Sequence, residues 1–139
     1  MSRFIPEKLR LLVSERAGFA CEYCLIHQDD LIASGQMDHI LSIRHGGLTT
    51  LENLAFSCAI CNNNKGYDFG HIFPDGTFVR FFNPRTDYWP EHFELSNGLI
   101  LPKTSIGQVT VQMLQLNDAN QVEKRQALTI EGRYPRVKF

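Results

Sequence analysis

Two identical cysteine pairs constrain this sequence more than any other feature. Each pair has the spacing CxxC, and the pairs are Cys21 with Cys24 and Cys58 with Cys61. Two thiolates on one tight turn can bind a single ion, and a second such turn completes a tetrahedral shell. We therefore predict a structural zinc site that joins two segments distant in the sequence. Redox-active or buried free thiols are the alternatives.

Composition and charge indicate a soluble globular protein. The 139 residues fit one domain of ordinary size, and 43% hydrophobic residues are too many for a disordered chain. The net charge of −1 differs from that of a strong nonspecific nucleic-acid binder. The sequence shows neither a membrane-spanning run of roughly 20 apolar residues nor a secretory signal at its start. We therefore expect a cytoplasmic protein with no membrane partner, and reducing conditions there favour zinc over disulfides.

The segments around the cysteine pairs are predicted to form a helix, two short strands and a second, shorter helix. A proline and apolar residues at helical spacing predict the first helix over residues 6–17, with Leu9, Leu12, Val13 and Arg16 on one face. Strands are expected over residues 36–42 and 54–56, where short runs are bounded by turn residues. Segment 62–65 has poor helix propensity, so a helix there would depend on bound metal.

Residues 71–139 are predicted to extend a single domain, residues 1–139, whose motif core is about 16–70. The expected elements are a strand over 77–82, a hairpin of 93–95 with 99–101, and helices over about 106–116 and 118–130, the second capped by Asp118. Aromatic residues of this part are expected to form core rather than a base-stacking surface. These are Phe78, Phe81, Phe82, Tyr88, Trp89 and Phe93.

The residues between and beside the cysteine pairs carry the groups that phosphodiester hydrolysis requires. A neutral histidine can take a proton from water near neutral pH, and His39 is the candidate. A divalent ion prefers hard oxygen ligands, which Asp38 and Asn62 could supply. Adjacent strand residues point to opposite faces, so Asp38 and His39 can serve one site only if the strand twists or ends there. Asn53 could orient the histidine or hold the loop that does.

These motifs resemble the HNH endonuclease family in its zinc-stapled form. The resemblance covers about residues 16–66, and its matching stretches are 16–24, 37–40, 45–47, 51–54 and 58–66. It implies a ββα-metal fold, in which a two-stranded hairpin and a helix hold one catalytic divalent ion. It further implies that His39 is the general base, that Asp38 is a metal ligand and that Asn53 holds the loop and the base in place.

One position departs from the family's most familiar letters. Asn62 stands where many members have a second histidine, which makes this an H-N-N form. Asparagine is common there within the family and keeps an oxygen ligand, so Mg²⁺ or Mn²⁺ is favoured over softer ions. The whole fold expected is therefore α+β: a ββα-metal core stapled by zinc, with an N-terminal helix and a C-terminal hairpin and helical extension.

The function expected from these residues is metal-dependent cleavage of DNA by an endonuclease. Lys65, Arg44 and His45 are candidates for contact with DNA phosphates. The first alternative is a catalytically inactive zinc module that binds nucleic acid or protein, because such a scaffold needs only the cysteines. A redox or zinc-storage protein is a further alternative. Either a monomer or a homodimer is compatible with the sequence, since cleavage of both strands of a symmetric site would suit a dimer.

Overall fold

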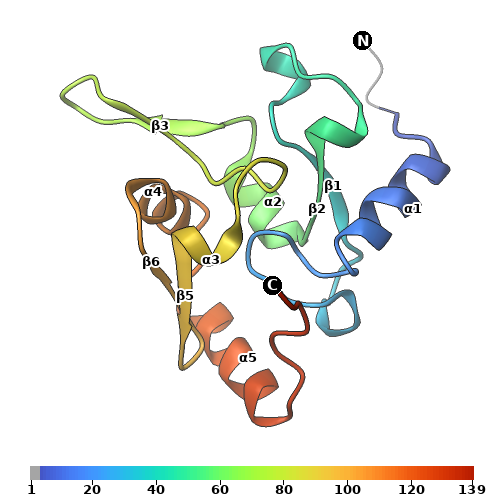
Figure 1. Ribbon diagram of the computed structural model, residues 1–139, viewed down its shortest axis with the longest axis vertical. Helices are drawn as coiled ribbons and strands as arrows, with labels where there is room; N and C mark the ends of the chain where they lie inside the picture. Colours follow the sequence, from blue (N-terminus) through green and yellow to red (C-terminus); the bar gives the residue numbers. More distant parts are fainter. Residues whose placement is uncertain (1–3) are drawn as a thin grey trace.

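The chain folds into helices and small antiparallel sheets, which confirms the predicted α+β class (Figure 1). The computed structural model describes residues 4–139. Its helices are α1 (Glu7–Arg16), α2 (Ala59–Lys65), α3 (Trp89–His92), α4 (Ser105–Met113) and α5 (Ala119–Ile130). Its strands pair as β1 (Gln36–His39) with β2 (Leu54–Ser57), β3 (Gly70–Ile72) with β4 (Phe78–Arg80), and β5 (Phe93–Ser96) with β6 (Leu99–Pro102). Within these residues, no helix has the length and apolar character needed to span a membrane.

Helix α1 packs one side against strand β2. Val13 is fully buried in a cluster with Leu54 of that strand. One turn later, Arg16 donates hydrogen bonds to the carbonyl oxygens of Leu51 and Leu54 at 2.9 and 2.7 Å. Leu12 is 42% exposed, so the prediction that it shares the buried face is wrong. Successive helical residues are turned by about 100°, which directs Leu12 away from the side that Val13 occupies.

Strands β1 and β2 and helix α2 form a ββα unit. The strands pair antiparallel, with His39 opposite Leu54. Helix α2 follows β2 directly and is capped by Cys58, whose Sγ accepts a hydrogen bond from the backbone N–H of Cys61 at 3.3 Å. The second predicted helix therefore forms, but it begins at Ala59, ahead of the expected segment 62–65. The cysteine turn itself is the first turn of this helix.

Residues of the C-terminal extension cover the first cysteine turn. The indole N–H of Trp89 donates to the carbonyl oxygen of Tyr23 at 3.0 Å. The hydroxyl of Tyr134 donates to the carbonyl oxygen of Cys24 at 2.7 Å. In Figure 1 the last segment of the chain accordingly returns to the middle of the molecule. The extension thus shares a buried cluster with the cysteines, while the boundaries of one domain over residues 1–139 stay a prediction.

The predicted hairpin and final helix are present in the extension. Asn97 and Gly98 join β5 to β6 with φ values of 49° and 81°, and a type I′ turn requires positive φ at both of these positions. Asp118 caps α5 by accepting a hydrogen bond from the N–H of Asn120 at 3.2 Å. The helix expected over residues 106–116 is α4, which ends at Met113.

Strands β3 and β4 form an arm that extends from the body, at the upper left of Figure 1. Strand β4 was predicted as part of residues 77–82, whereas β3 was not predicted. Four of the aromatic residues assigned to the core are buried, namely Phe81, Phe82, Trp89 and Phe93. Phe78 and Tyr88 are 47% and 50% exposed, so the core prediction is wrong for these two.

Candidate functional site

The two CxxC turns bring all four cysteines together. Their sulfur atoms lie within 4.8 Å of one another, all four residues are buried, and none forms a disulfide. The Sγ atoms of Cys24 and Cys58 are 3.8 Å apart. Zn–S bonds of about 2.3 Å in a tetrahedron require a separation of about 3.8 Å, so this donor set fits zinc. The cysteines could therefore hold one structural zinc ion.

The closeness of the sulfur atoms perturbs their ionisation. Contact with the Cys21 sulfur is the first cause that raises the pKa of Cys24 and Cys61 well above the ordinary thiol value. A hydrogen bond with the same Cys21 sulfur is the first cause that lowers the pKa of Cys58. Thiolates this close repel one another, and a divalent cation among them removes that repulsion. The electrostatics of the cluster thus agree with a metal centre.

Asp38 lies between the two cysteine turns and is 3% exposed. Its Oδ2 accepts a hydrogen bond of 2.5 Å from the hydroxyl of Tyr23, a residue between the first two cysteines. Its Oδ1 accepts a hydrogen bond of 3.1 Å from Nζ of Lys65, the last residue of α2. Burial raises the pKa of Asp38, and the positive charge of Lys65 opposes this shift. One donor thus lies within the first cysteine turn, and the other lies at the end of the helix that begins at the second.

Lys65, a candidate for contact with DNA phosphates, is buried in the structure. Its side chain is 2% exposed, so in this structure it does not reach a surface where DNA could bind. Its Nζ donates to Asp38 and to the carbonyl oxygens of His39 and Ile40, each at 3.1 Å. The ammonium group neutralises a buried carboxylate and joins the end of β1 to α2. The burial of Lys65 depends on long-range packing that the motif itself does not reveal.

Replacing Lys65 with methionine is expected to lower the free energy of unfolding by about 3–5 kcal/mol, because the Asp38 carboxylate would lose its buried counter-charge. Chemical denaturation of the zinc-loaded protein measures the change. Lys8→Met, at an exposed position of α1, is the control and should change stability little. Adding Asp38→Asn should recover part of the loss, and a loss below 1 kcal/mol would contradict the assigned pairing.

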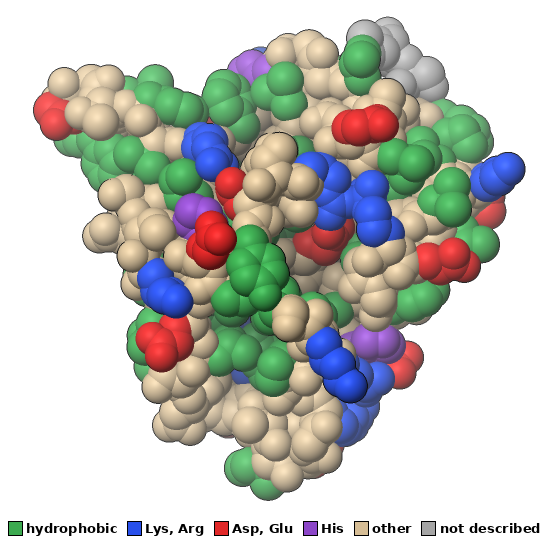
Figure 2. All heavy atoms as spheres, in the orientation of Figure 1, with side chains coloured by type: hydrophobic (Ala, Val, Ile, Leu, Met, Phe, Trp, Pro, Cys, Tyr) green, Lys and Arg blue, Asp and Glu red, His purple; other side chains and the backbone are tan. Residues whose placement is uncertain are grey.

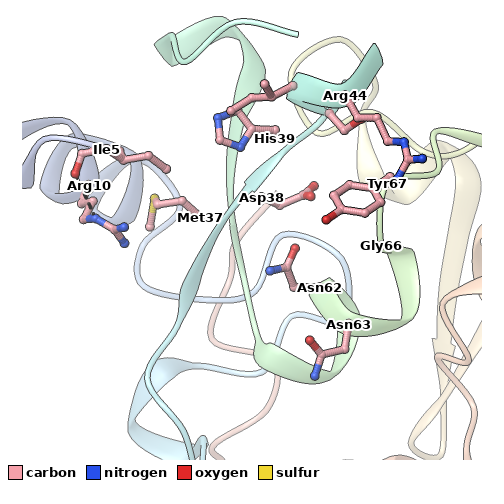
Figure 3. A pocket seen from close by; sticks show the side chains of 12 residues that line it. Ile5, Arg10, Met37, Asp38, His39, Arg44, Asn62, Asn63, Gly66 and Tyr67 are labelled. Atoms are coloured by element: carbon pink, nitrogen blue, oxygen red, sulfur yellow. Dashed lines mark hydrogen bonds between the residues drawn. The ribbon is translucent and has the colours of Figure 1, made fainter. Parts of the chain in front are cut away.

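His39 is the last residue of β1, and its ring is held by the following loop. Its Nε2 lies 3.0 Å from the hydroxyl oxygen of Thr49. The requirement that the strand end at this point is therefore met. Asp38 and His39 leave the strand in different directions, yet both line one cavity (Figure 3).

Asn53 pins the loop that carries Thr49. Its Oδ1 accepts a hydrogen bond from the N–H of Leu41, and its Nδ2 donates to the carbonyl oxygens of Leu41 and Leu48, at 2.8–2.9 Å. A Cβ at Gly47 would lie 1.7 Å from the Leu41 carbonyl oxygen, so only glycine fits where the loop closes on itself. Asn53 thus holds the backbone of the loop whose Thr49 hydroxyl lies against the His39 ring.

Replacing Asn53 with alanine is expected to lower the free energy of unfolding by about 1–3 kcal/mol, because part-buried backbone groups of the loop lose their partners. Amide hydrogen exchange should also become faster at Leu41. Asn63→Ala removes an exposed amide at the edge of the same cavity and serves as the control. Unchanged exchange at Leu41 would exclude the assigned role of Asn53.

Asn62 lies on α2 and faces the carboxylate of Asp38. Its Nδ2 donates a hydrogen bond of 2.7 Å to Oε1 of Gln36, two residues before Asp38 on β1. Because the amide nitrogen is engaged by Gln36, the amide oxygen points toward Asp38 (Figure 3). A carboxylate and an amide oxygen are thus brought together, and these are ligands that Mg²⁺ and Mn²⁺ accept.

The cavity in front of these groups has a volume of about 510 Å³. Its lining includes Asp38, His39, Asn62, Arg44 and Tyr67. Tyr23 and Lys65, which donate hydrogen bonds to Asp38 from the protein interior, do not line the cavity. Each carboxylate oxygen has more than one lone pair, so these hydrogen bonds leave acceptor capacity toward the cavity. The donor set and the space therefore fit a hydrated divalent ion.

Arg44 and His45 are exposed in the short turn Ile43–His45 after β1. Arg44 lines the cavity, and its guanidinium lies 5.4 Å from the centre of the Tyr67 ring. The ring of His45 lies 5.4 Å from that of Phe69. Both predicted residues are thus near the cavity, and their contact with phosphate stays a prediction.

Three contributing residues were not singled out from the sequence, namely Tyr23, Gln36 and Thr49. Gln36 had a usable signal, because residues two apart in a strand share a face and Asp38 follows it at that spacing. Tyr23 and Thr49 had none, since each reaches its partner only after distant segments pack together.

The ββα unit beside the four cysteines has the architecture of a ββα-metal domain. Residues 21–68 match the family model described as HNH endonuclease, and this segment contains both cysteine turns, β1, β2 and α2. The predicted resemblance is confirmed for this segment, which is similar to the HNH endonuclease family. No curated protein and no solved structure gives a significant match to the chain.

Proposed function

We propose that this protein is a metal-dependent endonuclease that hydrolyses DNA phosphodiester bonds. The observation that carries the proposal is the grouping of Asp38, His39 and Asn62 on one cavity, in a segment that matches the HNH family. Asp38 and Asn62 would hold the divalent ion, Mg²⁺ or Mn²⁺. When bound, such an ion supplies charge neutralisation at the phosphate and at the leaving 3′ oxygen.

His39 is the proposed general base. In the tautomer whose Nε2 donates to Thr49, Nδ1 carries the lone pair that accepts a proton from water. The hydroxyl of Thr49 fixes the ring, so that the base is oriented before the substrate binds. Asn53 holds the loop of Thr49 and is a positioning residue. This chain of contacts supports the proposal that the middle asparagine acts indirectly.

Asn62 and Asp38 have separate supports. Gln36 orients the amide of Asn62, while Tyr23 and Lys65 orient the carboxylate of Asp38. Arg44 and His45, exposed beside the cavity, would contact DNA phosphates, and Arg44 is the stronger candidate because its charge does not depend on pH. The proposed partner is DNA, and both a monomer and a homodimer stay open.

Cleavage of supercoiled plasmid in a series of divalent ions tests this proposal. Zinc-loaded protein should nick or linearise the plasmid with Mg²⁺ or Mn²⁺, and omission of the divalent ion should stop the reaction. Asn62→Ala should weaken the dependence on added ion, whereas Asn63→Ala is the neighbouring control. Wild-type protein that is inert on several DNA forms with every ion would contradict the proposal.

A catalytically inactive zinc module is the second candidate. The observation in its favour is that both oxygen atoms of the Asp38 carboxylate already accept hydrogen bonds from the protein. An inactive module would bind its partner equally well with and without added Mg²⁺. Binding without cleavage in the plasmid assay would favour this function.

A further inference from the structure

An exposed apolar surface, mostly aromatic, begins at the cavity and continues onto the arm. It consists of Tyr67, Phe69, Ile72 and Phe78, which are 46%, 41%, 67% and 47% exposed. We call these four residues the arm surface. In Figure 2 hydrophobic side chains extend along the arm at the upper left. Large apolar side chains grouped in this way on a protein surface commonly mark a binding site.

The aromatic rings of the arm surface lie against one another and against a neighbouring histidine. The centres of the Phe69 and Phe78 rings are 5.5 Å apart, and the ring of His45 lies 5.4 Å from Phe69 on the other side. A Cβ at Gly70 would lie 2.3 Å from the ring of Phe78. Glycine at this position therefore permits Phe78 to lie across β3, close to Phe69. The exposed rings are held in place by the fold of the arm.

The arm surface is continuous with the proposed active site. Tyr67 and Arg44 both line the cavity that contains Asp38 and His39, and they lie on the same side of it in Figure 3. The guanidinium of Arg44 lies over the Tyr67 ring at 5.4 Å from its centre. A DNA strand whose phosphate occupies the cavity would place neighbouring nucleotides against this cation and these rings.

We propose that the arm surface binds unpaired DNA bases next to the scissile phosphate. This inference rests on the proposed nuclease function, and it assigns the substrate class as DNA with a single-stranded or locally opened segment. Aromatic side chains stack on the faces of unpaired bases, whereas in a duplex those faces are covered by neighbouring base pairs.

The charge of the arm favours unpaired bases over an intact duplex. Asp68 and Asp75 are exposed on the arm, and its one arginine, Arg80, forms an ion pair with Asp87 at 2.6 Å. The arm therefore offers little net positive charge to the closely spaced phosphates of duplex DNA. Arg44 and His45 supply charge only beside the cavity. Stacking is thus expected to provide most of the affinity along the arm.

Fluorescence anisotropy with the full-length, zinc-loaded His39→Ala protein tests this inference without cleavage. The probes are a labelled single-stranded oligonucleotide, its duplex, and a duplex with a central unpaired bubble. The single strand and the bubble should bind at least about 10-fold more tightly than the duplex. Phe69→Ala together with Phe78→Ala should weaken binding to the single strand about 10-fold and change duplex binding little.

Tyr88→Ala is the matched control, because Tyr88 is 50% exposed and does not line the cavity. Thermal unfolding and zinc content of each variant establish that it is folded. Equal affinity for single strand and duplex, or arm variants that bind like the control, would overturn the inference. So would a concentration-dependent dimer that the arm variants abolish, since the surface would then bind a second copy.

Failure of this inference can be distinguished from failure of the nuclease proposal. Specific binding of unpaired DNA through the arm, with wild-type protein that cuts nothing, would retain the arm surface and overturn the nuclease. Cleavage of plasmid that the arm variants leave unchanged on every DNA form would retain the nuclease and overturn the arm surface.

Discussion

His39→Ala should lower the rate of DNA cleavage by about 10²–10⁴-fold, the usual effect of removing a general base. Alanine cannot accept a proton from water. The same replacement should change stability little, because the ring is only half-buried. Plasmid cleavage at saturating Mg²⁺ measures the rate, and thermal unfolding measures stability.

Two further variants refine this result. Thr49→Val keeps the shape of the side chain but removes the hydroxyl that orients the ring, so a smaller loss of rate is expected. His27→Ala is the matched control, since His27 lies beside the first cysteine turn and does not line the cavity. A His39→Ala protein that retains more than a tenth of wild-type activity would exclude His39 as the base.

Cys58→Ser should abolish cooperative folding. A structural zinc ion contributes about 10–16 kcal/mol in zinc-finger peptides, which is as large as the whole stability of an ordinary domain. Cys58 also caps α2, so its replacement perturbs both the proposed metal centre and the start of a helix. Near-ultraviolet circular dichroism and metal analysis should show loss of tertiary structure and of about one zinc ion per chain.

The control for this variant lies in the same turn. Ile60 is 45% exposed between Cys58 and Cys61, so Ile60→Ser alters the turn without touching the thiol cluster and should leave zinc content unchanged. A second measurement avoids reliance on an unfolded variant. Chelation of zinc from wild-type protein should remove the tertiary signal, and added zinc should restore it. A folded protein free of zinc would refute the structural role.

The sequence predicted those parts of the fold that depend on neighbouring residues. The turn of Asn97 and Gly98 and the cap of Asp118 were identified correctly because each feature is complete within a few residues. The cysteine turns were also identified, since CxxC spacing places two thiols on one turn. The exposure of Leu12 and Phe78 was not predicted, because the apolar character of a side chain does not indicate whether another element will cover it.

The supports of the candidate site could not be predicted from local sequence. The hydroxyl of Tyr23 reaches Asp38 across 15 residues, and Trp89 reaches the Tyr23 carbonyl across 66. Lys65 looked like a phosphate ligand because lysines are usually exposed, and only packing of α2 against β1 shows that it is buried. The motif indicated which side chains lie at the candidate site, whereas the hydrogen bonds that orient them depend on the packing of distant segments.

The hydrogen bonds from Tyr23 and Lys65 to Asp38 imply an order in which the two metal ions would bind. Tyr23 lies within the first cysteine turn, and Lys65 ends the helix that begins at the second, so both donors reach the carboxylate only when the two turns are fixed together. Zinc would then have to bind before the second ion finds its ligands in place. Protein made without zinc would therefore be inactive in DNA cleavage even when magnesium is present. A nuclease built in this way would carry its own safeguard against premature cutting.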